Sequence, residues 1–387
     1  MKTVFPLKAF NNIETPFYFY DTELLRETLS VAQNEAAKYD GFHVHYAVKA
    51  NFNPGLLQIV QRSGMGADCV SGGEVQAALA AGIPASKIVF AGVGKTDKEI
   101  AASLDAGIFC FNIESVPEAA AIEALAAERS MIASVAIRVN PNVAAHTHSN
   151  ITTGLAENKF GINYEQLDEV IDFIEAQNHL SLIGLHFHIG SQILAMDDFI
   201  ALCGRVNELQ AMLNEKRGLI LPHINVGGGL GIRYDAPDEY SIPDFARYFA
   251  TYSKHLKLFP GQQLHFELGR SLVAQCGSLI TRVIYVKHGT CKRFVIVDAG
   301  MNDLVRPALY EAYHRIDNLT AEDRPDEIYD VVGPICESSD VFCKDRKLPQ
   351  TERGDILAIR SAGAYGEAMA FGYNCRTLPK GYLSDDL

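Results

Sequence analysis

The chain has 387 residues, 48% of them hydrophobic and 21% charged, which is an ordinary globular composition and a length that allows more than one domain. Its net charge of −13 excludes broad nucleic-acid binding, because such binding requires a surplus of Lys and Arg on one face. A local basic pocket for one small anion is compatible with this charge.

The N-terminal stretch MKTVFPLKAF lacks the apolar core of a signal peptide, and no stretch approaches the roughly 18 apolar residues of a membrane span. We therefore expect a cytoplasmic protein that does not bind membranes. The cysteines form no C-x-x-C pair, which favours reduced thiols, most of them small core residues, over disulfides or structural zinc. They are Cys69, Cys110, Cys203, Cys276, Cys291, Cys336, Cys343 and Cys375.

The first predicted strand is FYFYD (17–21), which either extends the sheet that follows or joins a β-rich domain formed with the C-terminal part of the chain. From residue 43 to 270, short apolar runs then alternate with amphipathic or Ala-rich helical patterns, several of them entered through Ser, Asn or Asp caps. The predicted strands are 43–50, 65–71, 87–93, 108–114, 134–140, 182–190, 223–229 and 264–270. Eight strand-then-helix units of this length predict a (β/α)₈ TIM-type barrel, and an open doubly wound sheet is the alternative.

After Arg270 the pattern changes to β-rich runs with turns, such as KRFVIVDAG and DILAIRSAGAYG. This texture predicts a second, mostly antiparallel β domain. We place the barrel at residues 24–274 and the β-rich domain at 1–23 and 275–387. The acidic end YLSDDL is expected to be a solvated tail.

Function in a barrel gathers at the C-terminal ends of the strands, and several unusual residues fall there. Lys49 closes the first strand and Asp68 lies late in the second. Burial disfavours a charged amine, so a dry position would lower the pKa of Lys49 and make it a nucleophile for carbonyl groups. The alternative is a lysine that extends to a polar mouth.

Two further runs suggest ligand contacts near strands seven and eight. The glycines at 227–229 have no side chains to pack, so they predict either a close approach of backbone N–H groups to a phosphate or a tight turn. In FELGR, Glu267 and Arg270 are either a structural ion pair, or a carboxylate for a basic ring nitrogen and a cation for an anionic group.

Two H-x-H patterns offer a rival interpretation as metal-ligand pairs of a barrel hydrolase. They are His43 with His45 and His186 with His188, each pair on one predicted strand face. Two observations argue against a metal site. His43 and His45 lie well before the end of their strand, and the sequence shows no clear candidates for a third and fourth metal ligand.

A carbonyl-reactive lysine, a phosphate cradle and a carboxylate for a ring nitrogen together describe a site for pyridoxal 5′-phosphate. Seven motifs also occur along the chain in this order: YAVKAN, HFHIGSQ, NVGGGLG, ELGR, DAGMNDLVRPALY, GPICESSD and AGAYG. Through these motifs the sequence resembles the alanine-racemase-fold decarboxylases over nearly its whole length, and most closely the diaminopimelate decarboxylases among them.

The resemblance implies a role for each matched position. Cofactor contacts are implied for Lys49, which holds the cofactor covalently, His188, which stacks on its ring, Glu267, which faces the ring nitrogen, and Asp68, Ser191, Gly227, Gly228, Gly229, Leu268, Gly269, Arg270 and Tyr365. Substrate contacts are implied for Arg270, Arg306, Tyr310, Glu337 and Tyr365. Cys336 matches the proton donor, with Lys49 as the alternative acid. One position departs from the family, because Leu268 replaces a proline that would fix the backbone φ angle.

The implied reaction is decarboxylation of meso-2,6-diaminopimelate to L-lysine and CO₂. Its substrate carries a second amino-acid centre, which needs a cation for the distal carboxylate and an anion for the distal ammonium. Arg270 or Arg306 and Glu337 supply both signs. The family further implies a homodimer in which Cys336 and Glu337 complete the partner's site.

Other activities remain as alternatives. On a related scaffold these are carboxynorspermidine, ornithine or arginine decarboxylation, a pyridoxal-phosphate racemase, and a non-catalytic pyridoxal-phosphate carrier. The metal-dependent barrel hydrolase is the alternative from a different class. Release of CO₂, metal content and visible absorption distinguish them.

Overall fold

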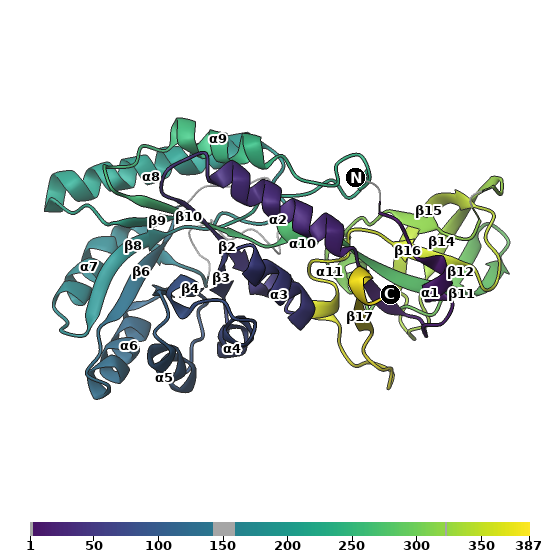
Figure 1. Ribbon diagram of the computed structural model, residues 1–387, viewed down its shortest axis with the longest axis horizontal. Helices are drawn as coiled ribbons and strands as arrows, with labels where there is room; N and C mark the ends of the chain where they lie inside the picture. Colours follow the sequence, from purple (N-terminus) through teal and green to yellow (C-terminus); the bar gives the residue numbers. More distant parts are fainter. Residues whose placement is uncertain (1–2, 142–158, 322) are drawn as a thin grey trace. The chain divides into compact units, whose positions relative to one another are not determined.

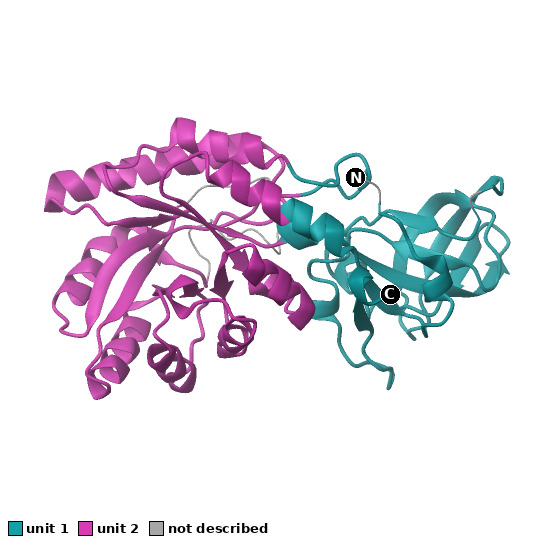
Figure 2. Cartoon of the chain, in the orientation of Figure 1, with its two compact units in different colours: residues 1–28, 232–243, 270–387 teal, residues 29–231, 244–269 magenta. Residues whose placement is uncertain are grey.

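The computed structural model describes residues 3–141, 159–321 and 323–387, and the chain divides into two compact units (Figure 2). The barrel unit comprises residues 29–231 and 244–269. The β-rich unit comprises residues 1–28, 232–243 and 270–387. The short segment 232–243 therefore belongs to the β-rich unit, although barrel residues precede and follow it in the sequence.

Eight parallel strands form the barrel, in the order β5-β4-β3-β2-β10-β9-β8-β6, and pairing of β5 with β6 closes the sheet. The strands are β2 (Phe42–Ala47), β3 (Gly66–Cys69), β4 (Ile88–Phe90), β5 (Cys110–Ile113), β6 (Ala133–Asn140), β8 (Leu180–His186), β9 (His223–Asn225) and β10 (Gln263–Leu268). A short β7 (Ile162–Asn163) pairs with β6. All eight predicted strands are confirmed, and closure excludes the open doubly wound sheet.

Helices cover the outside of these strands (Figure 1). They are α3 (Pro54–Arg62), α4 (Gly72–Ala80), α5 (Asp97–Ala106), α6 (Val116–Glu128), α7 (Leu167–Glu175), α8 (Met196–Arg217) and α9 (Phe245–His255), while α2 (Thr22–Ala36) runs across the boundary of the two units. Ser71 and Ser115 cap α4 and α6 by accepting the N–H groups of Glu74 and Glu118. These serines satisfy N–H groups that would otherwise lack a partner, which confirms the predicted caps.

Alternation along β10 separates the two faces of the barrel wall. The ring of Phe266 packs outward against α9, with centroids 4.9 Å from Phe249 and 5.2 Å from Tyr252. The next residue, Glu267, points inward and contacts Asn112 of β5 across the barrel. Aromatic packing thus fixes the strand from outside, and the interior is left for polar groups.

The β-rich unit is built on one mostly antiparallel sheet in the order β13-β16-β11-β12-β14-β15. Its strands are β11 (Gly277–His288), β12 (Arg293–Val297), β13 (Ile316–Asn318), β14 (Asp326–Val332), β15 (Val341–Pro349) and β16 (Ile356–Ile359). β1 (Phe17–Tyr20) pairs with β11, and β17 (Lys380–Leu383) pairs with β1. FYFYD therefore belongs to this unit, and its alternative placement against the barrel was wrong. Its buried core includes a cluster of Phe10, Phe17, Phe19, Ile280, Ile356 and Ala358.

Some details differ from the sequence-based expectations. The acidic end is no solvated tail, because β17 pairs with β1 and Thr22 Oγ1 donates to Asp385 Oδ1 over 2.6 Å. The predictions missed β13, β15 and β17, and the short helices α1 (Leu7–Phe10), α10 (Arg270–Val273) and α11 (Arg306–Tyr310). Five of the eight cysteines are buried and all are free thiols. Across the described residues, no helix has the length and apolar character required to cross a membrane.

Candidate active site

The predicted site residues divide between the two units. The barrel unit holds Lys49, Asp68, His188, Ser191, Gly227, Gly228, Gly229, Glu267, Leu268 and Gly269. The β-rich unit holds Arg270, Arg306, Tyr310, Cys336, Glu337 and Tyr365.

Glu267 lies inside the barrel near the end of β10, with its carboxylate enclosed by three partners. Asn225 and Asn112 donate side-chain N–H groups to Oε1 over 2.7 and 3.2 Å. His186 Nε2 lies 3.0 Å from Oε2. A carboxylate has about four acceptor positions, so these contacts leave one for a further donor.

Glu267 is held as a carboxylate. Burial acts against its ionisation, since only 7% of the residue is exposed. The charge and hydrogen bond of His186, together with the charge of Lys49, outweigh burial and hold the pKa of Glu267 well below its usual range. A buried carboxylate of this kind favours the protonated form of a ring nitrogen placed beside it.

Lys49 lies in a single 3₁₀ turn (Val48–Ala50) directly after β2, and not in the strand itself as predicted. Its Nζ is 3.7 Å from Oδ2 of Asp68 in β3. Among the described residues neither carboxylate oxygen of Asp68 has a hydrogen-bond partner, and burial, reinforced by the charge of Glu267, raises the pKa of Asp68 to about 8. The Lys49 side chain is 38% exposed, so the prediction that it lies in a dry environment was wrong. The Asp68 side chain, which is 1% exposed, is the buried member of this pair.

Lys95, which sequence reasoning did not single out, is the more deeply buried lysine. Its Nζ donates to Glu118 Oε1 over 2.5 Å and to the carbonyl oxygens of Gly92 and Asn112 over 2.8 and 2.9 Å. An ammonium group has three donors, so this lysine is fully engaged. Lys95 is therefore a structural lysine held by Glu118.

The glycines at 227–229 lie in the loop after β9, against the backbone of neighbouring strands. A Cβ on Gly228 would lie 2.0 Å from the carbonyl oxygen of Glu267, and one on Gly227 would lie 2.4 Å from that of Phe187. Gly227 and Gly229 also have φ angles of +66° and +104°. Packing and turn geometry thus account for the glycines by themselves, and phosphate binding needs separate support.

His188 lies two residues beyond the end of β8, so the His186/His188 pair does not share one strand face as predicted. The Gly228 N–H donates to His188 Nδ1 over 3.5 Å. Burial, with the positive charges of Lys49 and Arg138, lowers the pKa of His188 well below its ordinary value and keeps the ring neutral. A neutral imidazole is suited to stack on an aromatic ring.

The H-x-H pairs do not assemble a metal centre. His186 bonds to Glu267, and His45 bonds to His265. In the described part of the chain, no three His, Cys, Asp or Glu side chains are placed to share one metal ion. The rival metal-dependent hydrolase thus finds no ligand set among these residues.

In the β-rich unit, two buried arginines meet at one hydroxyl group. NH1 of Arg270 and NH1 of Arg306 each donate to the phenolic oxygen of Tyr234 over 2.6 Å. The two residues are 7% and 5% exposed. Burial, with the charge of Arg270, lowers the pKa of the Arg306 guanidinium from its ordinary value, and the group still stays protonated at neutral pH.

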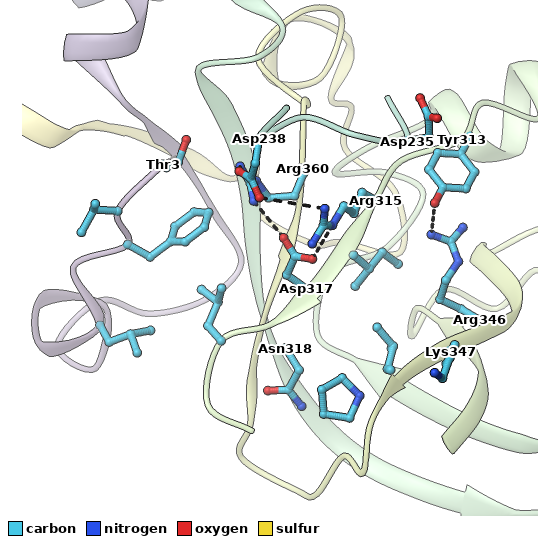
Figure 3. A pocket seen from close by; sticks show the side chains of 17 residues that line it. Thr3, Asp235, Asp238, Tyr313, Arg315, Asp317, Asn318, Arg346, Lys347 and Arg360 are labelled. Atoms are coloured by element: carbon cyan, nitrogen blue, oxygen red, sulfur yellow. Dashed lines mark hydrogen bonds and ion pairs between the residues drawn. The ribbon is translucent and has the colours of Figure 1, made fainter. Parts of the chain in front are cut away.

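A second arginine cluster in the same unit shows what an internally paired arrangement looks like (Figure 3). Arg360 bonds to Asp317 and Asp238 over 2.8 Å each, and Arg315 bonds to Asp317 over 2.7 Å. Arg306 differs, because it forms no ion pair with any carboxylate among the described residues. A buried cation that has no carboxylate partner among the described residues points to an anionic ligand.

Cys336 and Glu337 lie on an exposed loop between β14 and β15. Asn374 Oδ1 accepts the backbone N–H of Cys336 over 3.2 Å, and the Tyr373 hydroxyl donates to Glu337 Oε1 over 2.7 Å. The buried Asp340 carboxylate accepts the Ile335 N–H over 2.7 Å. The loop is thus held at its base and along its exposed side.

The remaining predicted residues can be located within their own units. Tyr365, with a φ of +56°, lies under the Arg270 guanidinium, 4.9 Å from it to the ring centroid. Leu268 is the last residue of β10, is 1% exposed and pairs with Tyr46 of β2. Tyr310 is half-buried at the end of α11. Ser191 is half-buried in the loop after β8, and Gly269 follows β10 directly.

Sequence reasoning missed several residues that hold the site. Asn112 is the penultimate residue of β5 and Asn225 is the last residue of β9, and polar residues near those two strand ends were an available signal. His186 was considered only as a metal ligand. Tyr234 offered no signal, because its role depends on the segment 232–243 belonging to the β-rich unit.

These groups match the needs of pyridoxal phosphate. Glu267 offers an ionised carboxylate for a ring nitrogen, Lys49 an amine beside a buried carboxyl group, and His188 a neutral ring. The two buried oxygens of Asp68 without hydrogen-bond partners are the mark of a site built for a further polar group.

Three comparisons with known proteins agree with this chemistry. Residues 25–274 match the family model described as pyridoxal-dependent decarboxylase, pyridoxal binding domain. A diaminopimelate decarboxylase of Bacteroides thetaiotaomicron is 64% identical over 387 residues, covering 100% of both chains. One of Neisseria meningitidis serogroup B is 44% identical over 96% of this chain and 88% of its own length.

Solved structures are similar as well. The diaminopimelate decarboxylase of Helicobacter pylori complexed with L-lysine has a TM-score of 0.91 and 40% identity, covering 98% of this chain and 94% of that one. A lysine/ornithine decarboxylase of Vibrio vulnificus, with a TM-score of 0.84 and 20% identity over 98% of this chain and 97% of that one, shares the fold. The chain therefore belongs to the pyridoxal-dependent decarboxylase family and, within it, to the diaminopimelate decarboxylases.

Proposed function

We propose that this chain removes CO₂ from meso-2,6-diaminopimelate to form L-lysine, with Lys49, Glu267 and Cys336 as the central groups. The observation that carries the choice of substrate is the buried Arg306, which has no carboxylate partner among the described residues and shares Tyr234 with Arg270. A binding site that contains two arginines suits a substrate with a second carboxylate. Ornithine, arginine and related amines lack that group.

Residues 24–274, the barrel domain expected from the sequence, would form the cofactor-binding domain. Lys49 is the group that attaches the cofactor aldehyde, and the glycines at 227–229 with Ser191 and Tyr365 are assigned to its phosphate. Asp68, Leu268, Gly269 and Arg270 complete the set. Pyridoxal phosphate supplies an electron-poor ring that accepts the electron pair left when CO₂ departs.

The protein groups set the protonation states for that chemistry. Glu267 uses its remaining acceptor position to hold a proton on the ring nitrogen, because an adjacent carboxylate favours the cationic form. His188 stacks on the ring and orients it. Cys336 delivers the proton to the carbon that lost CO₂, and Lys49 is the alternative donor.

The β-rich domain expected from the sequence, residues 1–23 and 275–387, would recognise the substrate together with Arg270. Arg270 and Arg306 bind the distal carboxylate, Glu337 binds the distal ammonium, and Tyr310 and Tyr365 line the site. Binding groups of both charges allow the protein to distinguish a substrate with a distal amino-acid centre, which has a carboxylate and an ammonium, from a substrate with a distal amine alone.

The test is to incubate the protein and pyridoxal phosphate separately with meso-diaminopimelate, carboxynorspermidine, ornithine and arginine, and to follow CO₂ and product. We expect CO₂ and L-lysine from diaminopimelate, with far slower release from the others. Borohydride reduction and peptide mapping should place the cofactor on the peptide that contains Lys49. Absence of label at Lys49 in a holoprotein that releases CO₂ would remove this residue from the mechanism.

We further propose a homodimer in the cytoplasm, in which Cys336 and Glu337 of one chain serve the site of the other. The exposed position of this loop supports that arrangement. Lys49→Ala and Cys336→Ala chains would each be impaired alone. Mixed after dissociation, they should regain activity at about a quarter of the sites, as random pairing in a two-fold dimer requires. No gain on mixing would contradict shared sites.

A further inference from the structure

Tyr234 is a single acceptor for two buried cations. Each guanidinium uses one N–H to reach the phenolic oxygen at 2.6 Å, so NH1 of Arg270 and NH1 of Arg306 are at most about twice that distance apart. Two like charges this close repel each other. Their shared contact with one oxygen sets the spacing of the pair.

The ring of Tyr234 is itself fixed. It packs edge-on against His314, with centroids 5.0 Å apart at 73°, and the Arg306 guanidinium lies over its face at 5.1 Å. His314 is 1% exposed and donates its Nδ1–H to the Arg360 carbonyl oxygen over 2.9 Å. The hydroxyl position is therefore determined by packing and not by solvent.

The Arg306 guanidinium keeps donors for a ligand. An arginine has five N–H groups in a planar fork, the bond from NH1 to Tyr234 engages one of them, and Nε of Arg306 has no hydrogen-bond partner among the described residues. A carboxylate placed beside the pair would accept N–H groups from Arg306 and offset the charges of both arginines. Because the two arginine side chains are already held by Tyr234, they lose little conformational entropy when a ligand binds.

We propose that Tyr234 is a positioning residue that sets selectivity for ligands with a distal carboxylate, by holding Arg270 and Arg306 as one cradle for that group. This inference rests on the proposed function, which supplies the carboxylate. Tyr234 acts through the arginines and takes no part in bond breaking. No motif of the family resemblance includes it, because it lies in the segment 232–243.

The test compares two ligands that differ only by that carboxylate, L-lysine and 1,5-diaminopentane. Both offer a primary amine to the holoenzyme, and equilibrium binding of each is measured on the same preparation. Tyr234→Phe removes one oxygen and keeps the ring. It should weaken L-lysine binding about tenfold, the scale of one hydrogen bond to a charged group, and leave 1,5-diaminopentane within about twofold.

Tyr313 provides the matched control. Its hydroxyl accepts NH1 of Arg346 over 2.8 Å, and that guanidinium lies 4.2 Å from its ring centroid (Figure 3). It lines a separate pocket of about 760 Å³ in the same unit. Tyr313→Phe should leave both affinities unchanged, because this tyrosine–arginine pair is not part of the cradle.

The outcome separates the inference from the function on which it rests. An unchanged ratio of L-lysine to diaminopentane affinity in Tyr234→Phe would overturn the role of Tyr234, even if the unaltered protein decarboxylates diaminopimelate. Absence of CO₂ from diaminopimelate in the unaltered protein would instead overturn the function. Partial misfolding lowers the amount of both complexes and not the ratio, so it cannot imitate the expected result.

Discussion

His45 and His265 are hydrogen-bonded to each other inside the barrel, with His45 Nε2 2.9 Å from His265 Nδ1. The Lys87 carbonyl, 3.1 Å from His45 Nδ1, can only accept, so His45 donates there and its neutral Nε2 accepts from His265. His265 Nε2 then accepts from His223 Nδ1, 3.0 Å away. One carbonyl group thus fixes the tautomers of three neutral imidazoles.

This histidine chain predicts loss of stability in mild acid. Burial lowers the pKa of His45 from 6.5 to about 4, against the opposing charge of Glu267. The pKa values of His265 and His223 are also lowered, first by burial and then by neighbouring histidines, including His43. Between pH 6.5 and 4, these histidines bind protons in the unfolded chain but not in the folded chain. The free energy of unfolding is therefore at its full value above pH 6.5 and falls as the pH decreases toward 4. His45 alone accounts for about 3 kcal/mol.

Urea unfolding between pH 4 and 8 measures this effect. His45→Gln should lower the absolute stability and reduce the pH slope by about 1.4 kcal/mol per pH unit, the value for one proton. His288→Gln, at an exposed histidine at the end of β11, is the control and should leave the slope unchanged. Equal slopes in the unaltered protein and His45→Gln would contradict the assignment.

Glu267→Gln tests the carboxylate at the barrel centre. The amide keeps the size of the side chain and loses the negative charge that would stabilise a protonated ring nitrogen. We expect kcat to fall about 10²–10³-fold, the scale of one preorganised electrostatic contact, with a smaller change in KM. Glu123 forms a comparable pair with His179 at 2.9 Å on the outside of the barrel. Glu123→Gln should therefore leave kcat unchanged, and an equal loss in both variants would argue against the central role of Glu267.

Lys95→Met tests the buried lysine that is paired with Glu118. Removing the ammonium leaves Glu118 without its buried partner, so the free energy of unfolding should fall by about 3 kcal/mol in a denaturant titration. Lys95→Met/Glu118→Gln should recover part of that loss, since the uncompensated charge is gone. Cofactor labelling at Lys49 should persist in both variants. Loss of the label in Lys95→Met with unchanged stability would reverse the roles of the two lysines.

The barrel was predictable because its parallel strands are buried on both faces and read as apolar runs. Strand ends were harder, since the chain leaves β2 at Ala47 while the apolar pattern continues to Ala50. β17 was missed because its partner is β1, more than 350 residues earlier in the sequence, and a local pattern carries no information on such pairing.

Within the candidate site, the sequence alone singled out residue types that are unusual for their place, such as Lys49 and Glu267. Supporting groups were not singled out, because Asn112 and Asn225 become meaningful only when the closed sheet brings β5 and β9 to Glu267. Tyr234 is a stronger case, since its role requires one segment to belong to a different unit from its sequence neighbours.

Tyr373→Phe tests the exposed loop that carries Cys336 and Glu337. Without the 2.7 Å bond from the Tyr373 hydroxyl, Glu337 loses its fixed orientation, and KM for diaminopimelate should rise about two- to tenfold, the scale of one exposed hydrogen bond. The value of kcat should change less, because Cys336 is held separately through its backbone N–H by Asn374.

Substitutions at Asn374 test the position of Cys336 separately from that of Glu337. Its φ of +48° is tolerated by Asn, Asp and Gly, so Asn374→Asp keeps the acceptor and Asn374→Gly removes it without backbone strain. Because the Cys336 N–H depends on that acceptor, we expect kcat to fall in Asn374→Gly and to be retained in Asn374→Asp. Steady-state kinetics with diaminopimelate would show this split. Equal kcat values in the two variants would mean that the loop keeps Cys336 in place without Asn374.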